Sequence, residues 1–215
     1  MKRVLLVALI TMAIITAVSA AWYASKLQHK STLQPHLPGA NIIEDGFANK
    51  KLGGIAAAAK RYADTHQYNT RVCFLIDMEL ASGKQRFFVY DLKADKVIRA
   101  GLVTHGCCNQ NWLAGRKYGN AVGCGCTSPG KYKVGNPYQG RFGLAYKLYG
   151  LDASNSNAYG RFVVLHSMQC VPEAAVDPYP ICQSDGCPAV SPVFLKELAA
   201  LIDNSQQPVL LWIYE

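Results

Sequence analysis

The sequence has few acidic residues, since 14 Asp and Glu stand against 22 Lys and Arg and give a formal net charge of +8. It has no internal repeat, no low-complexity segment and no basic run interleaved with aromatic residues. With 50% apolar and 10% aromatic residues, the chain is not broadly disordered. The missing basic run argues against nucleic-acid binding. The positive balance suits an anionic polymer or lipid surface, or it is only a solvated basic surface, and both interpretations stay open.

Charged residues are also absent from Val4 to Ala24, a segment that follows the basic Lys2 and Arg3. This pattern indicates an export signal. Residues 1–24 are either a signal peptide, with Val18–Ala20 resembling a small-residue cleavage site, or an N-terminal membrane anchor of about 20 residues. On both interpretations we expect the rest of the chain in the periplasm or cell envelope, with membrane contact only through this segment.

Eight cysteines in an exported chain predict disulfides. Cys73 lies in an apolar run and is expected to be a buried small hydrophobe. Six more lie in two loop-like regions and can staple them, although their connectivity is not fixed by sequence; they are Cys107, Cys108, Cys124, Cys126, Cys170 and Cys182. Their spacing matches no usual zinc pattern, so we expect no metal. Cys187 is left as a free thiol and a candidate reactive group.

After a polar, proline-containing linker over 25–45, the pattern predicts a mainly β (α+β) single domain over 46–215. An alanine-rich helix is expected at 52–66, and a second helix begins at Pro192 with Ser191 as its N-cap. The first three strands, joined by tight turns, should be antiparallel. The expected strands are 72–80, 85–92, 97–105, 131–135, 141–148, 161–166 and 208–214, and the long segment 106–130 is expected to be a stapled loop.

The window from His166 to Cys187 offers the groups that cysteine-based acyl transfer needs. His166 ends a predicted strand, where an imidazole can act as a base. Cys187 lies in a turn before the second helix, whose N-terminus can depress a thiol pKa. Gly186 lets backbone donors approach a substrate carbonyl. Residue types alone also allow a rim histidine and a disulfide-bonded cysteine.

The motif Arg161–Ser167, followed by a spacer and Ser184–Pro188, resembles the signature of the L,D-transpeptidase (YkuD-like) catalytic domain. Gly150–Ala158 and Cys182–Pro192 are similar to the subgroup of murein L,D-transpeptidase catalytic-domain proteins. With Arg86–Leu92 and the final strand, the resemblance covers nearly everything from Arg71 onward.

The resemblance implies a role for each matching residue. Cys187 matches the nucleophile, His166 the base that forms a thiolate–imidazolium pair with it, and the Gly186 and Cys187 amides the oxyanion hole. Ser167 matches the residue that orients the imidazole, often through its backbone carbonyl, and strand alternation points its side chain away from His166. Asp185 departs from the family pattern, which has a second histidine there.

Several other residues near this motif are candidates for shaping the site. Ser184, Asp185 and His105 are candidate substrate-binding residues, although His105 is otherwise a loop-anchoring histidine. Arg161 should point to the opposite face of its strand from His166, where a structural salt bridge is its expected role. Cys170 and Cys182 bracket the loop between base and nucleophile, so we expect them to pair and shape its entrance.

The resemblance implies an exported cysteine acyltransferase that needs no cofactor and acts on peptidoglycan stem peptides. Cys187 would form a thioester with the third residue of a tetrapeptide stem, release D-alanine and transfer the acyl group to an amine of a second stem. Carbapenems are expected inhibitors. Two alternatives remain: an L,D-carboxypeptidase that uses water, and a non-catalytic, disulfide-stapled cell-wall-binding module.

Overall fold

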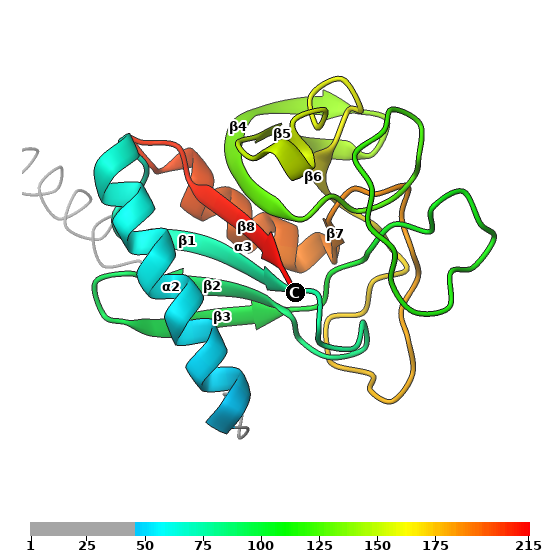
Figure 1. Ribbon diagram of the computed structural model, residues 1–215, viewed down its shortest axis with the longest axis horizontal. Coiled ribbons are helices and arrows are strands. Elements are labelled where there is room, and N and C mark those ends of the chain that lie inside the picture. Colours follow the sequence, from blue (N-terminus) through cyan, green and yellow to red (C-terminus); the bar gives the residue numbers. More distant parts are fainter. Residues whose placement is uncertain (1–45) are drawn as a thin grey trace, which may run out of the picture. The chain divides into compact units, whose positions relative to one another are not determined.

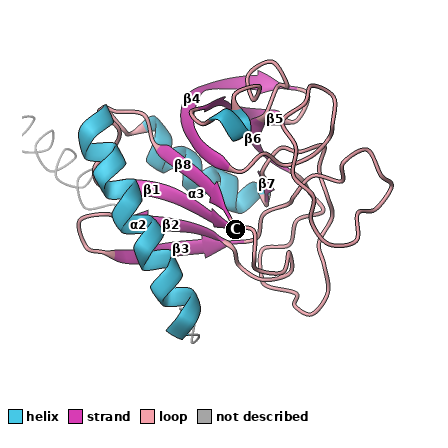
Figure 2. Ribbon diagram, viewed as in Figure 1, coloured by secondary structure: helices cyan, strands magenta, loops and turns pink. Residues whose placement is uncertain are grey.

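A mixed eight-stranded β-sheet is the central element of the computed structural model, which describes residues 46–215 (Figures 1 and 2). The predicted export segment 1–24 and linker 25–45 lie outside the described residues. In spatial order the strands are β3 (Lys96–Gly101), β2 (Phe87–Asp91), β1 (Val72–Asp77), β8 (Leu210–Tyr214), β4 (Gly130–Gly140), β5 (Gly143–Gly150), β6 (Val164–Ser167) and β7 (Ala189–Val190).

Two helices cover opposite faces of the sheet. Strand side chains alternate between the two faces, so each face carries apolar side chains that a helix can bury. Helix α2 (Gly46–His66) precedes the sheet and buries Leu52, Ala56, Ala59 and Ala63, a helical spacing, in one core cluster. That cluster includes Cys73 and Leu75 of β1, whereas the intervening Phe74 and Ile76 belong to the other cluster. Helix α3 (Pro192–Asp203) adds Phe194, Leu195, Leu198 and Ala199 to the second cluster.

The predicted mainly β domain with one helix before it and one near the C-terminus is therefore confirmed. The antiparallel order of β1, β2 and β3 is also confirmed. Ser191 caps α3, since its Oγ accepts a hydrogen bond from the Phe194 N–H at 3.1 Å. Cys73 is fully buried, as expected.

Apolar residues extend past the points where sheet pairing stops, so five predicted strands are shorter in the structure; the second is Phe87–Asp91 and the last is Leu210–Tyr214. The first ends at Asp77 and the third at Gly101. The sixth begins only at Val164, since Phe162 has a positive φ of 56° and lies in a turn. The connection between β1 and β2 is thus a loop over 78–86, rather than a four-residue hairpin turn.

The long loops gather at one end of the sheet (Figure 1). A segment of the 102–129 loop runs beside the turn before β7, as the Gly106–Ser184 bridge shows. Strand β6 pairs antiparallel with β5 and parallel with β7, so it lies between the β4–β5 hairpin and this turn. These loops and β6 together enclose the region that contains His166 and Cys187.

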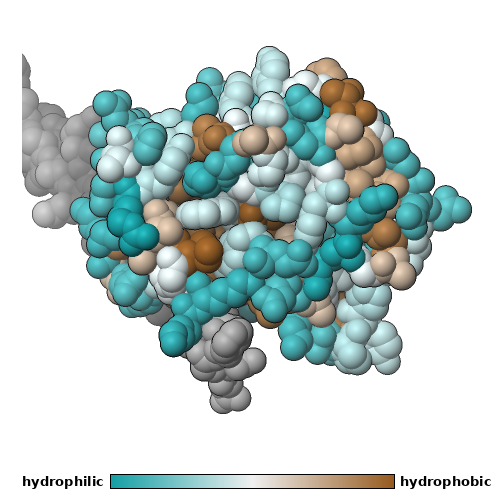
Figure 3. Space-filling model, viewed as in Figure 1, coloured by the Kyte–Doolittle hydropathy of each residue, from teal (hydrophilic) through white to brown (hydrophobic). Residues whose placement is uncertain are grey.

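The surface of the described residues is mainly hydrophilic on the face that Figure 3 shows, and the apolar residues there form small, separate groups. Within residues 46–215, no helix is both long enough and apolar enough to cross a bilayer.

Candidate functional site

The turn that carries Cys187 is clamped by hydrogen bonds from residues 104–107. The Thr104 N–H donates to the Ala189 carbonyl at 2.9 Å, and the Cys107 N–H donates to the Ser184 carbonyl at 2.8 Å. The buried Thr104 hydroxyl donates to the Cys187 carbonyl at 3.2 Å and accepts from the Ala189 N–H at 3.0 Å. The loop after β3 therefore fixes both ends of the nucleophile turn.

Gly186 occupies a position that no residue with a side chain fits. Its φ is +103°, and a Cβ there would lie 2.5 Å from the Cys126 carbonyl oxygen and 3.1 Å from Arg161 Nη2. The left-handed backbone and this close approach both require glycine. The disulfide-bonded loop that contains Cys126 is thereby seated directly against the turn before Cys187.

The Cys187 thiol is free and partly buried beside strand β6. Its Sγ lies 3.5 Å from the Val164 backbone N–H, which donates to it, and 3.7 Å from the Phe162 carbonyl oxygen. Burial raises the thiol pKa and outweighs the Val164 N–H and the Arg161 cation, which lower it; Asp185 raises it further. The net shift of the thiol pKa is therefore upward, whereas the sequence led us to expect a lower pKa from the nearby helix N-terminus.

His166 is a buried, neutral imidazole with a defined tautomer. Its Nδ1 lies 3.0 Å from the Ser167 carbonyl oxygen, which can only accept, so Nδ1 carries the proton and Nε2 keeps its lone pair. The Phe142 ring stacks on the imidazole with centroids 4.2 Å apart. Burial lowers the His166 pKa, the Ser167 carbonyl raises it, and the nearby Arg141 cation lowers it.

Cys187 lies in the turn before β7 and His166 lies on β6, and within residues 46–215 no hydrogen bond joins their side chains. The thiol sits at Val164, and the side chain of His166 is the next one on the same face of β6. Burial favours the neutral form of both groups, and the thiolate–imidazolium pair stays a prediction.

Ser184 organises the backbone amides of the turn. Its buried hydroxyl donates to the Cys187 carbonyl at 2.6 Å and accepts from the Gly186 N–H at 3.2 Å. One of the two predicted oxyanion-hole amides is therefore already engaged. Within residues 46–215 the Cys187 N–H has no hydrogen-bond partner and is the amide available to a substrate oxygen.

Asp185 is exposed at the rim of the turn, next to a second thiol. Cys107 Sγ lies 3.8 Å from Asp185 Oδ1 and donates to it. Among the described residues, no group of three or more His, Cys, Asp and Glu side chains is arranged to hold a metal ion.

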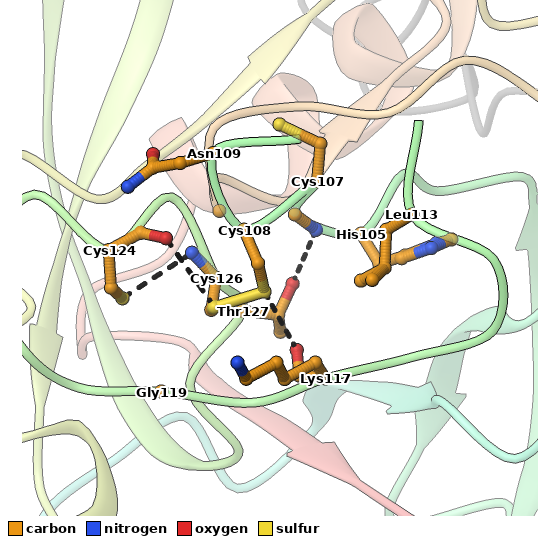
Figure 4. Close-up of a disulfide and its surroundings, with 12 residues drawn as sticks. His105, Cys107, Cys108, Asn109, Leu113, Lys117, Gly119, Cys124, Cys126 and Thr127 are labelled. Carbon is orange, nitrogen blue, oxygen red and sulfur yellow. Dashed lines mark hydrogen bonds between the residues drawn. A yellow bond between two sulfur atoms is a disulfide. The ribbon is translucent and has the colours of Figure 1, made fainter. Parts of the chain in front are cut away.

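Two disulfides staple the loops around this region. Cys170 pairs with Cys182, as expected, and closes the loop between His166 and Cys187. Cys108 pairs with Cys126 (Figure 4). The expectation that all six loop cysteines pair is wrong, because Cys107 and Cys124 are free. Figure 4 shows the Cys107 side chain pointing away from the Cys108–Cys126 disulfide. An even number of loop cysteines therefore did not mean that every one of them has a partner within reach.

The sequence of residues 45–214 matches a family model described as the L,D-transpeptidase catalytic domain. The chain belongs to this family. A comparison with the curated proteins gives no match.

Several solved L,D-transpeptidase structures are similar to this family member at low identity. One from Xylanimonas cellulosilytica is 17% identical, with 72% of this chain and 68% of that chain covered and a TM-score of 0.40. An Enterococcus faecium mutant is 14% identical, covering 67% and 50%, with a TM-score of 0.42. One from Mycobacterium smegmatis is 14% identical, covering 67% and 59%, with a TM-score of 0.39. This chain spans about half to two thirds of their lengths.

His105 of this L,D-transpeptidase family member directs its imidazole into a separate pocket. Its backbone carbonyl accepts from the Ser184 N–H at 2.9 Å, but its Nδ1 lies 3.1 Å from Arg86 Nη2. Burial and the Arg86 and Arg116 cations lower the His105 pKa to about 4. The pocket has a volume of about 270 Å³, and Trp112, Leu113, Pro180 and Gln183 are among its lining residues.

Within residues 46–215, Arg161 does not form the predicted salt bridge. Its guanidinium donates to backbone carbonyls, including that of Gly119 at 2.9 Å, and it hydrogen-bonds the Ser128 hydroxyl. Strand alternation does not apply to Arg161, because this residue precedes β6 and lies in a turn. Arg161 ties the stapled loop to the nucleophile turn and supplies positive charge near Cys187.

Phe142 and Thr104 also shape the site, although the sequence did not single them out. Phe142 lies in the turn between β4 and β5, and nothing in its local sequence shows that this turn folds over His166. Thr104 lies in a segment that was expected to be a strand, and nothing in the sequence indicated that its hydroxyl would hydrogen-bond the Cys187 turn. The Thr-His-Gly sequence at 104–106, directly before a cysteine-rich loop, was the one available signal.

Proposed function

We propose that this protein is a peptidoglycan L,D-transpeptidase that uses Cys187 as its nucleophile, His166 as its base and the Ser167 carbonyl to orient that base. The observation that carries the proposal is the tautomer of His166. Since Nδ1–H is held by Ser167, the free lone pair of Nε2 is the proton acceptor on the strand face where the Cys187 thiol lies.

The reaction begins from a neutral thiol and a neutral imidazole. A rotation of the Cys187 side chain away from Val164 brings Sγ toward His166, and such contacts commonly tighten when substrate binds. The thiol proton passes to His166 Nε2 as sulfur attacks the carbonyl of the third stem residue. The Cys187 N–H stabilises the developing oxyanion.

Collapse of the tetrahedral intermediate breaks the bond to the terminal D-alanine, whose amine takes the proton from His166. The thioester on Cys187 is then attacked by the side-chain amine of a second stem. That amine loses a proton to His166, and the proton returns to sulfur when the thioester bond breaks. The sequence is balanced and needs no cofactor.

Family membership supports peptidoglycan stems as the proposed donor and acceptor. A buried thiol that forms a thioester is also expected to be acylated by carbapenems. The periplasm or cell envelope is the proposed location, in agreement with the apolar segment at residues 4–24 and with the two disulfides.

The test is product analysis by mass spectrometry after incubation with purified disaccharide-tetrapeptide. We expect loss of D-alanine and a linked dimer with the wild-type protein, and neither with Cys187→Ala. Cys107→Ala is the matched control, because it removes a free thiol near the site without touching the nucleophile. Loss of D-alanine without dimer would instead indicate an L,D-carboxypeptidase, and no turnover a binding module.

A further inference from the structure

One face of the β4–β5–β6 part of the sheet carries aromatic and basic side chains. Tyr132, Tyr146 and Leu148 point into the hydrophobic core. The residues that alternate with them, Lys133, Lys147 and Tyr149, therefore lie on the opposite face. Tyr138 joins them there, because it pairs with Ala145 across the hairpin.

These side chains are in mutual contact. The rings of Tyr149 and Tyr159 stack with centroids 5.3 Å apart and planes inclined by 12°. Lys133 Nζ lies 4.8 Å from the centre of the Tyr149 ring, and Lys147 Nζ lies 5.6 Å from the rings of both Tyr138 and Tyr159. We call this group, Lys133, Tyr138, Lys147, Tyr149 and Tyr159, the aromatic–basic face.

Much of the aromatic–basic face is open to solvent. Tyr159 is 56% exposed and Tyr138 is 36% exposed. Within residues 46–215, neither Lys133 nor Lys147 forms a salt bridge, although other lysines of the chain do. Large exposed aromatic surface together with cations that lack carboxylate partners is typical of a binding surface for an anionic ligand.

The aromatic–basic face leads directly to the candidate site. Ala145 pairs with His166 and Lys147 with Val164, so all these side chains share one side of the sheet. Phe142, which is 41% exposed, stacks on His166, and Arg141 lies over the Phe142 ring at 4.6 Å. A ligand held on the aromatic–basic face would thus reach the imidazole.

We propose that the aromatic–basic face binds the sugar chain of peptidoglycan and so presents an attached stem peptide to Cys187; this inference rests on the proposed function. Pyranose rings offer flat C–H faces that pack on aromatic rings, and the open tyrosines provide such surfaces with hydroxyls for polar contacts. Lys133 and Lys147 would meet the carboxylates that the polymer carries. Glycan, rather than nucleic acid or lipid, suits exposed tyrosines interleaved with lysines on a sheet face next to the proposed acyl-transfer site.

The test is co-sedimentation or affinity electrophoresis with two ligands and no turnover. One ligand is glycan strands stripped of stem peptides, which keep their lactyl carboxylates; the other is a neutral N-acetylglucosamine oligomer. The variants are Tyr138→Ala with Tyr159→Ala, and Lys133→Gln with Lys147→Gln. Tyr179→Ala is the matched control, because Tyr179 is 73% exposed and lies in the loop closed by the Cys170–Cys182 disulfide.

We expect the tyrosine pair to weaken binding of both ligands by about tenfold. The lysine pair should weaken only the carboxylated strands, in a salt-dependent manner. Thermal unfolding of each variant shows that the fold is intact. The proposal is overturned if the tyrosine variant binds like Tyr179→Ala, or if anionic vesicles or RNA compete as well as glycan.

Failure of the proposed function gives a different result. A protein that binds stripped glycan through the tyrosines but never forms a thioester retains the inference and loses the transpeptidase. A protein that turns over tetrapeptide but whose glycan binding ignores the tyrosines does the reverse.

Discussion

At the residue scale, the site holds its two reacting groups in neutral forms. Burial raises the pKa of the Cys187 thiol and lowers that of His166. A neutral base beside a neutral thiol can still perform general-base catalysis, since proton transfer accompanies attack. The charges of Asp185, Arg161 and Arg141 therefore adjust the pKa values of the thiol and the imidazole, and with them the reactivity of Cys187.

Asp185 is the neighbouring charge that most directly opposes thiolate formation. Because its carboxylate raises the Cys187 pKa, Asp185→Asn should lower that pKa and speed alkylation of Cys187 at fixed pH near neutrality. Mass spectrometry of the Cys187 peptide separates this rate from alkylation of Cys107 and Cys124. Asp64→Asn, an exposed carboxylate on α2, is the control and should leave the rate unchanged. An unchanged rate in Asp185→Asn would contradict this electrostatic assignment.

Phe142 and Arg141 should set the protonation of His166. Phe142→Ala removes the stacked ring that contributes to burial, and Arg141→Gln removes a cation, so each should raise the His166 pKa. The acid limb of the pH–rate profile then moves to higher pH, because the imidazole must be neutral to act as a base. Titration of the His166 ring by NMR measures the change, with Tyr179→Ala as reference. A lower pKa in either variant would be inconsistent with this account.

At the element scale, the nucleophile turn is held between β6, residues 104–107 and the Cys126 loop. Gly186→Ala should disrupt this arrangement, because the added Cβ meets the Cys126 carbonyl and the backbone has a positive φ. We expect destabilisation of about 1–3 kcal/mol and loss of most activity. Thermal unfolding and turnover measure the two effects. Gly53→Ala is the control, since space is open there, and equal behaviour of the two variants would contradict the close packing.

Periodicity predicted most elements of this fold but not their ends. The alternation in β1 and the helical spacing in α2 and α3 follow burial directly, so these elements were predictable. Phe162 and Val163 are as apolar as a strand needs, yet a turn with positive φ at Phe162 takes them out of the sheet. Tertiary contacts of Arg161 with the stapled loop, which local sequence does not encode, accompany that turn.

At the scale of the whole molecule, the buried imidazole of His105 should make the free energy of unfolding depend on pH. His105 has a pKa of about 4 in the folded state, against 6.5 for an ordinary histidine. Between these values the unfolded chain binds a proton that the folded chain excludes, so acidification favours unfolding. About 3 kcal/mol of stability should be lost as pH falls from 6.5 to 4, with no further loss from this group below pH 4.

Denaturant unfolding at several pH values tests this dependence. His105→Gln should flatten the curve between pH 6.5 and 4, since the variant has no imidazole to protonate. If the slopes of variant and wild type are equal in this window, His105 is not the group responsible.

The two reacting residues of the candidate site, His166 and Cys187, could be predicted from the sequence, but the contacts around them could not. The motif around His166 and Cys187 carried the resemblance, and the Ser167 carbonyl lies where that resemblance implied. The ring over His166 and the clamp of Thr104 on the Cys187 turn both depend on contacts between segments distant in sequence. Such contacts are set by packing, and a single chain contains no pattern that reveals them.

The most direct test of the central claim is intact-protein mass spectrometry during reaction with disaccharide-tetrapeptide, followed by peptide mapping. We predict an adduct equal in mass to the substrate minus D-alanine, located on Cys187, present in wild type and Cys107→Ala and absent in Cys187→Ala. An adduct on another residue, or turnover that persists in Cys187→Ala, would contradict the assignment of Cys187 as the nucleophile.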